Sequence, residues 1–221
     1  MHRLLRTVVA VAFLVVVAAC ADPDDWSRSR PVPAPAGVLG AGFTDPATPP
    51  TPEAVITPSP GSWSSVRPAE GYRVVLLTAG EDAPTRALVT AVTDWAAAEE
   101  VSLKTVTADV TKPVDAIVAA MQMRPDLIVS AGNDLIDPLA LVSPNHLDQQ
   151  FLIVGAEIAE PTHNVTAVDW TGASFRGEGL GAASAFDPAS FTGERCAAAI
   201  RAGVAAVLHD VTGIVLWLDQ F

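Results

Sequence analysis

The sequence predicts an α/β fold: a three-layer αβα sandwich on a mostly parallel, doubly wound sheet of five to six strands. Three observations favour this class. Short apolar runs, such as LIVSA at residues 127–131, stop abruptly at glycine turns, as fully buried parallel strands do. These runs alternate with stretches of helical period, and parallel neighbours need such crossovers. A hydrophobic share of 50% in 221 residues is enough for the core of such a fold.

The predicted elements follow one another from residue 72 onward. Residues 83–100 place Leu88, Val92 and Trp95 at helical spacing, so this helix can pack one apolar stripe on a sheet. Residues 101–108 alternate apolar and polar side chains, which is typical of a half-exposed edge strand. In chain order, strands are expected at residues 73–80, 101–108, 127–131, 150–157, 164–170 and 213–218, and helical segments at 83–100, 113–124, 135–149 and 192–209. A doubly wound sheet gives the first five strands the order 2-1-3-4-5.

The first nineteen residues have the features of a targeting segment. Arg3 and Arg6 precede an apolar run at residues 7–19, which is too short to span a membrane. The run ends in Val-Ala-Ala before Cys20, a pattern that resembles the bacterial lipobox, in which the peptide is cut before the cysteine and the cysteine is lipidated. We expect a lipoprotein signal peptide at residues 1–19 and a lipid on Cys20, which places the protein at the extracytoplasmic face of the cell membrane. A simple cleaved signal and an uncleaved anchor are the alternatives.

The charge argues against a nucleic-acid partner. Removal of residues 1–19 takes away two arginines and no acid, so the formal net charge of −12 becomes −14. Such a surface repels nucleic acid and anionic lipid head groups. Membrane attachment is therefore expected to come from the lipid and not from a basic patch.

A proline-rich segment follows the cysteine. Residues 21–71 hold 11 of the 18 prolines, mixed with Ala, Thr, Ser and Gly, and show no sustained apolar period. Proline denies the backbone a hydrogen-bond donor, and such a composition buries too little surface to offset its ordering entropy. We expect residues 20–71 to be a disordered tether with stretches of polyproline II. Residues 72–221 then form the single folded domain.

Side chains suited to catalysis, cofactors or metals are missing from the expected places. Once Cys20 is acylated, Cys196 has no disulfide partner, and its apolar surroundings predict a buried small hydrophobe. The four histidines are scattered, GASFRG at residues 172–177 lacks the spacing of a nucleophile elbow, and no P-loop or metal-ligand spacing is present. We therefore expect a protein that is not an enzyme and carries no cofactor and no metal.

Polar residues cluster where the predicted strands end. Because ligands of open α/β sheets bind at the carboxyl edge of the sheet, these positions are the candidate ligand site. They are Thr78, Gly80, Glu81, Ser130, Gly132, Asn133, Asp134, Glu157, Asp169 and Trp170. Carboxylates and amides beside one tryptophan could hold a sugar or nucleoside by hydrogen bonds and stacking. The alternative is that Asp134 caps a helix while Glu157 and Asp169 are simply solvated.

The stretch PDLIVSAGND, continued by QFLIVGAE and then NVTAVDWTGASFRGEGLGA, resembles the basic membrane protein family of substrate-binding lipoproteins. The resemblance covers about residues 73–183. It implies a type 1 periplasmic-binding fold and delivery of purine nucleosides or similar solutes to an ABC importer. Of the family's site, it carries over the turn Gly132-Asn133 and the acidic Glu157. Such proteins close two lobes over a ligand, whereas residues 72–221 suffice for one lobe, with residues 172–188 where a second would insert.

Two functions stay open at this stage. The first is a lipid-anchored solute-binding-like protein that captures a polar small molecule and works with an ABC permease. The second is a structural or partner-binding envelope lipoprotein that has lost its ligand, because the open cleft face of a single lobe can serve as an interface or a homodimer surface.

Overall fold

The computed structural model describes residues 25–28 and 30–221. The expected signal peptide at residues 1–19 and the expected lipid site at Cys20 lie outside the described residues, so both stay predictions. Within the described part of the chain, no helix is both long and apolar enough to cross a membrane.

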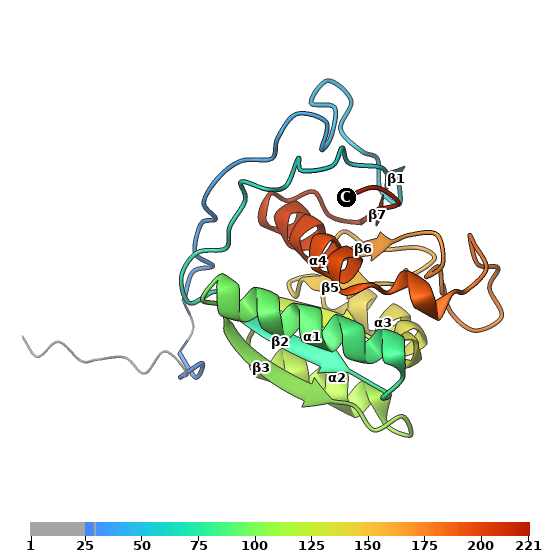
Figure 1. Cartoon of the computed structure of the whole chain (residues 1–221). Coiled ribbons are helices and arrows are strands. Elements are labelled where there is room, and N and C mark those ends of the chain that lie inside the picture. Colours follow the sequence, from blue (N-terminus) through green and yellow to red (C-terminus); the bar gives the residue numbers. More distant parts are fainter. Residues whose placement is uncertain (1–24, 29) are drawn as a thin grey trace, which may run out of the picture.

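A single sheet of seven strands forms the centre of the molecule (Figure 1). Its order is β1-β7-β6-β5-β4-β2-β3, and every neighbouring pair of strands is parallel. The strands are β1 Val55–Ile56, β2 Arg73–Thr78, β3 Ser102–Thr107, β4 Leu127–Ala131, β5 Phe151–Val154, β6 Val165–Asp169 and β7 Ile214–Trp217. The predicted α/β class and the order 2-1-3-4-5 are confirmed, with β2 as the first expected strand. The sheet has one strand more than expected, β1.

Helices cover both faces of the sheet and complete the three predicted layers. The helices α1 Ala83–Ala98 and α4 Gly193–Leu208 share one apolar core, and α2 Pro113–Gln122 and α3 Ile136–Val142 share the other (Figure 1). Short 3-10 turns occupy Asn133–Leu135, Ser143–Asn145 and Pro188–Ser190.

The local sequence explains where these elements lie and where they begin. Every residue of β2, β4, β5 and β6 is buried, which accounts for their continuous apolar runs, whereas β3 alternates in exposure as an edge strand does. The side chains of Asp82 and Thr192 accept backbone hydrogen bonds at the first turns of α1 and α4. In α4, a Cβ atom on Gly203 would lie 2.5 Å from the side chain of Leu152, so glycine lets the helix approach β5 closely.

The segment of residues 30–71, here called the N-terminal arm, is not the disordered tether that its composition predicts. Its two halves pair with each other: Ala36 N donates to Arg67 O at 2.9 Å, and Gly40 N donates to Ser62 O at 2.6 Å. Between these halves lies β1, which pairs with the sheet edge at β7. Figure 1 shows the arm leaving the start of β2, reaching β7 and returning. The predicted boundary at residues 71 and 72 is therefore corrected, because the arm belongs to the folded unit.

Widely spaced apolar side chains attach the arm to helices α1 and α4. Phe43 is 2% exposed and Trp63 is 5% exposed, and both belong to the core on that face. Beside them, the carboxylate of Glu99, directly after α1, pairs with Arg67 of the arm at 3.2 Å and with Arg201 of α4 at 2.6 Å. An irregular arm can fold without a periodic apolar pattern when its few apolar side chains pack on a surface that other elements provide, here α1 and α4. This is why composition alone predicted disorder.

Replacing Trp63 with alanine tests this docking. We expect Trp63→Ala to lower the free energy of unfolding by about 3 kcal/mol, because a large buried side chain and its contacts with the helices are lost. Chemical denaturation followed by circular dichroism measures the change. The control is Val38→Ala in the same arm, whose side chain is 69% exposed and which should change stability by less than about 0.5 kcal/mol. Equal stability of the two variants would show that the arm does not dock in solution.

Candidate functional site

A pocket of about 440 Å³ lies at the carboxyl edge of the sheet, between the ends of β2 and β4. After β2 the chain crosses to β3 on one side of β2, and after β3 it crosses to β4 on the other side. The direction of winding therefore reverses between β2 and β4. In open α/β sheets this switch point is where ligands bind, and the volume falls within the usual range for small-molecule sites. The lining residues are Ala79, Asp82, Ala83, Pro84, Thr85, Leu88, Gly132, Asn133, Asp134, Phe186, Pro188 and Phe191.

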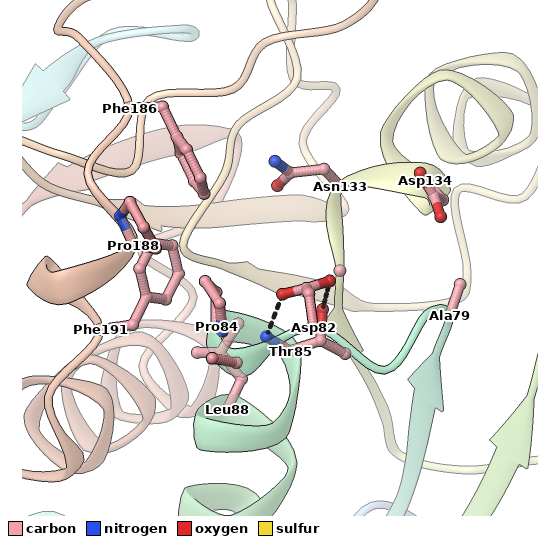
Figure 2. Close-up of a pocket in the computed structure, with 12 residues that line it drawn as sticks. Ala79, Asp82, Pro84, Thr85, Leu88, Asn133, Asp134, Phe186, Pro188 and Phe191 are labelled. Atoms are coloured by element: carbon pink, nitrogen blue, oxygen red, sulfur yellow. Dashed lines mark hydrogen bonds between the residues drawn. The ribbon is translucent and has the colours of Figure 1, made fainter.

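The turn after β2 forms the first wall. Asp82 begins α1, and its two carboxylate oxygens accept from the backbone N and the hydroxyl of Thr85 at 2.9 and 2.8 Å (Figure 2). The carboxylate is therefore already engaged as the cap of its own helix. Behind it, Leu88 of α1 contributes apolar surface to the pocket floor.

The turn after β4 forms the second wall. Gly132 has a φ of 117°, and a Cβ atom there would lie 2.6 Å from the carbonyl oxygen of Ala79, so only glycine lets the two turns meet this closely. Figure 2 shows the amide of Asn133 pointing toward Phe186 across the pocket, with Asp134 directed to the other side. Within the described residues neither the Asn133 nor the Asp134 side chain has a hydrogen-bond partner, so both are available to a ligand.

Residues 171–191, here called the rim segment, supply the third wall. Phe186 lies at the pocket mouth with 54% of its surface exposed, while Phe191 is 7% exposed and packs edge-on against Trp170 with ring centroids 5.0 Å apart. The two phenylalanine rings lie 6.0 Å from each other. A fixed inner ring and an exposed outer ring give the pocket one aromatic side.

The structure brings only part of the expected site together. Gly132, Asn133 and Asp134 line the pocket, and Gly80 lies next to it, with Asp134 Oδ2 3.8 Å from a Cβ built on that glycine. Glu81 is exposed and outside the lining. Thr78 and Ser130 are buried in the sheet, and their hydroxyls have no partner among the described residues.

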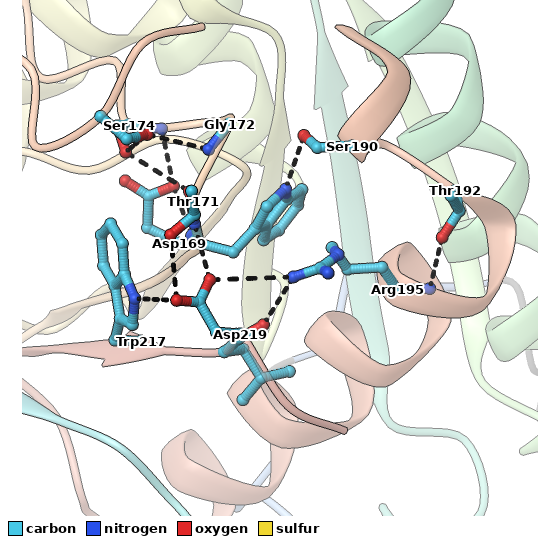
Figure 3. Close-up of polar contacts among 12 residues, drawn as sticks. Asp169, Thr171, Gly172, Ser174, Ser190, Thr192, Arg195, Trp217 and Asp219 are labelled. Carbon is cyan, nitrogen blue, oxygen red and sulfur yellow. Dashed lines mark hydrogen bonds and ion pairs between the residues drawn. The ribbon is translucent and has the colours of Figure 1, made fainter. Parts of the chain in front are cut away.

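The expected ligand contacts of Asp169 and Trp170 are corrected. Trp170 is fully buried, and its indole N–H donates to the hydroxyl of Ser190 at 3.0 Å, so its ring cannot stack on a solute (Figure 3). One oxygen of Asp169 accepts from the backbone N of Trp170 and of Ser174, both at 2.8 Å. These side chains hold the root of the rim segment in place instead of meeting a ligand. The alternative of a solvated Asp169 is wrong as well, since this residue is fully buried.

Glu157 also lies outside the pocket. It is 5% exposed, and its carboxylate pairs with the guanidinium of Arg176 in the rim segment at 2.5 Å. Burial raises the pKa of Glu157, and Arg176 opposes this rise. Its role in the structure is to tie the rim segment to the end of β5.

A second carboxylate at the strand ends, Asp219, fastens the rim segment from β7. It accepts from the backbone N and the hydroxyl of Thr171 at 2.8 and 2.9 Å and from the indole of Trp217 at 3.0 Å (Figure 3). Asp169 and Asp219 together bind the first residues of the rim segment, so the placement of Phe186 and Phe191 depends on these two acids.

Sequence reasoning missed the aromatic wall and Asp82. Phe186, Pro188 and Phe191 lie in or beside a stretch rich in Gly, Ala and Ser that carries no periodic pattern. The available signal was the presence of three phenylalanines, Phe175, Phe186 and Phe191, in a segment made mostly of small residues. For Asp82, the signal was its position just before Pro84 at the start of a predicted helix.

The chemistry of the pocket suits binding. Its lining contains two carboxylates, one free amide and two phenylalanines, with no lysine, arginine, histidine or cysteine. Among the residues that the structure describes, no group of acids, histidines and cysteines has the arrangement of a metal site. The predicted burial of Cys196 is confirmed, and this burial raises the pKa of its thiol to about 11.

A scan against known protein families gave no match for this chain, and a search of curated proteins gave none either. Among solved structures, the chain is similar to an ABC transporter system solute-binding protein from Aeropyrum pernix K1, with 20% identity, 45% of this chain and 29% of that chain covered, and a TM-score of 0.41. The chain is also similar to an ABC transporter system solute-binding protein from Conexibacter woesei DSM 14684, with 20% identity, 45% of this chain and 35% of that chain covered, and a TM-score of 0.37.

A third similar structure is a fragment of a "putative lipoprotein" from Peptoclostridium difficile 630. It shows 17% identity, covers 63% of this chain and 99% of that chain, and has a TM-score of 0.45. The chain thus spans only 29% and 35% of the two solute-binding proteins. At these scores the similarities do not decide the function. The resemblance to the basic membrane protein family stays a prediction.

The buried Asp169 predicts a pH dependence of stability. Burial raises its pKa from 3.8 to about 7, with Glu157 and Asp219 adding to the rise. Folded Asp169 therefore keeps a proton that the unfolded chain releases, so the contribution of Asp169 to stability is greatest below about pH 4 and is lost as the pH rises through about 7. Asp169→Asn should flatten this slope and raise stability above pH 7 by on the order of 3 kcal/mol.

Denaturation at a series of pH values measures this effect. The amide oxygen of the asparagine can still accept from both backbone N–H groups, so the local geometry is kept. The control is Glu178→Gln, an exposed acid of the rim segment, which should leave the slope as it is. An unchanged slope in Asp169→Asn would contradict the assignment.

Proposed function

We propose that this chain is a lipid-anchored extracytoplasmic binding protein whose single α/β lobe holds a small polar ligand in the pocket between β2 and β4. The observation that carries the proposal is the pocket at the switch point of the sheet, with the Asn133 amide and the Asp134 carboxylate facing no partner within the described residues. If the protein serves in transport, it would deliver this ligand to an ABC permease.

The chemistry of the lining defines the class of ligand. Phe186 and Phe191 offer a flat apolar side, the Asn133 amide offers hydrogen-bonding groups opposite, and the Asp134 carboxylate lines the far side of the pocket. Because the lining is acidic and has no cation, an anionic ligand would be repelled. A neutral or cationic compound with a flat ring and polar substituents, such as a nucleoside, fits best. We also infer that the protein binds without catalysis, since the lining offers no nucleophile with an adjacent base.

Isothermal titration with a panel of nucleosides and sugars tests ligand binding. We expect Asn133→Ala to weaken binding about tenfold, because the ligand loses a hydrogen bond and keeps an unpaired polar group. Phe186→Ala should weaken it by a similar factor through lost ring contact. The controls are Asn145→Ala, an exposed asparagine outside the pocket, and Leu180→Ala, whose side chain is exposed to the same 54% as Phe186. No binding across the panel would contradict solute capture.

A second function is favoured by the exposed apolar side chains of the rim segment. Phe186 and Leu180 are each 54% exposed on the same segment, and such side chains can form a surface for a protein partner or a second copy. Light scattering at micromolar concentration separates the two functions. A dimer that Phe186→Ala breaks would favour this one, and a strictly monomeric protein that binds a nucleoside would favour the first.

The lipid anchor is part of the proposal and rests on the apolar run and the Val-Ala-Ala sequence before Cys20. We expect Cys20→Ala to move the protein from the membrane fraction to the soluble fraction, because the single attachment point is lost. Immunoblotting of fractionated cells measures this shift. The control is Cys196→Ala, which removes the other cysteine and should leave the protein with the membranes. A Cys20→Ala protein that stays in the membrane fraction would overturn the anchor.

A further inference from the structure

The first described residues are fastened to the edge of the sheet opposite the pocket. Trp26 is 4% exposed, and its indole N–H donates to the hydroxyl of Ser102 at the start of β3 at 3.0 Å. The ammonium of Lys104 lies 4.4 Å from the centre of the Trp26 ring, and the guanidinium of Arg73, at the start of β2, lies 5.8 Å from it. The tryptophan is therefore held by the amino ends of two neighbouring strands.

The backbone on both sides of Trp26 is held as well. The guanidinium of Arg73 donates to the carbonyl oxygens of Asp25 at 3.1 Å and Arg28 at 3.0 Å. Two residues further on, Arg30 pairs with Asp126, which follows α2, at 2.6 Å. The first described residues, from Asp25 onward, thus lie at the amino ends of the strands, at the left of the sheet in Figure 1.

The length of chain before this point is short. Only five residue steps separate Cys20 from Asp25. An extended chain spans at most about 3.5 Å per residue, so these steps reach no further than about 18 Å. A disordered segment of some fifty residues would have left the domain free to turn in any direction, whereas this length keeps the amino ends of β2 and β3 next to whatever holds Cys20.

The distribution of charge favours the same orientation. The edge around Trp26, counted together with the residues back to Cys20, carries five cations and six acids. The cations are Arg28, Arg30, Arg73, Lys104 and Arg124, and the acids are Asp22, Asp24, Asp25, Glu70, Glu100 and Asp126. The formal charge of this edge is −1. Since the chain from Cys20 onward has a formal charge of −14, the rest of the molecule carries −13. An anionic bilayer repels the rest of the molecule and hardly repels this edge.

We propose that the edge formed by Trp26 and the amino ends of β2 and β3 faces the bilayer surface directly, so that the pocket opens away from the membrane. The inference rests on the lipid anchor proposed above and assigns the membrane as the partner of this edge. It adds an orientation to the binding site, because all strands are parallel and the pocket lies at their carboxyl ends.

Energy transfer to vesicles tests the orientation. The chain beginning at Cys20 is coupled through that thiol to maleimide lipids, with phosphatidylglycerol in the bilayer, so that the anchor exists whether or not cells lipidate the cysteine. Cys196 is buried and should not react. A fluorescent amino acid replaces either Gln122, exposed beside Trp26, or Glu178, exposed in the rim segment, and the acceptor is a head-group dye. We expect higher transfer from position 122 than from position 178.

A linker variant shows whether chain length causes the difference. Insertion of about forty Gly and Ser residues after Cys20 gives an average reach of about 35 Å, and the difference between the two positions should be lost. The matched control carries the same linker after Phe221 and should keep the difference. Equal transfer from both positions without a linker, or a difference that the linker after Cys20 leaves intact, would overturn the proposal. Because the maleimide coupling supplies the anchor, the vesicle experiment does not depend on lipidation in cells. A Cys20→Ala protein that stays with the membranes would overturn the lipid anchor but would leave the measured orientation valid. The two proposals can therefore fail independently.

Discussion

Parallel pairing is the constraint on which the rest of this molecule depends. A parallel strand must be followed by a crossover that returns the chain to the same end of the sheet, so the strand ends gather by type: amino ends along one edge and carboxyl ends along the other. The crossovers cover both faces of the sheet, so the two edges formed by the strand ends are the parts open to a ligand or to other segments of the chain. One edge receives the pocket, between β2 and β4. The other receives the first described residues, around Trp26.

The rim segment is a long irregular connection that forms one wall of the pocket. It leaves the sheet after β6 and leads into α4. Its root is held by Asp169 and Asp219, and Phe191 fills the space against Trp170. Asp169, which sequence reasoning assigned to a ligand, thus helps to position the aromatic side chains that form one wall of the pocket.

The sequence predicted those parts of the structure whose signal is local. Strands buried on both faces appear as apolar runs, and Gly132 marks the turn where two loops meet, so the sheet order and the location of the pocket could be derived. Asp169 and Trp170 were assigned wrongly because their partners are backbone N–H groups and a serine at the far end of the rim segment. The arm was assigned wrongly for a related reason. Its contacts join residues far apart in the sequence, such as the ion pair between Arg67 of the arm and Glu99, which also binds Arg201, and no periodic pattern predicts them.

The position of Trp26 has a consequence for how such a protein could serve a transporter. A carrier that hands its cargo to a permease in the same membrane must turn its loaded side toward that membrane. A domain held within five residues of the proposed anchor at Cys20 has little freedom to do so. A lobe fastened in this way is better suited to act as an outward-facing receptor. It would meet its ligand, or a second protein, on the side of the envelope that lies beyond the bilayer. Transport would first require the release of the Trp26 ring from the amino ends of β2 and β3.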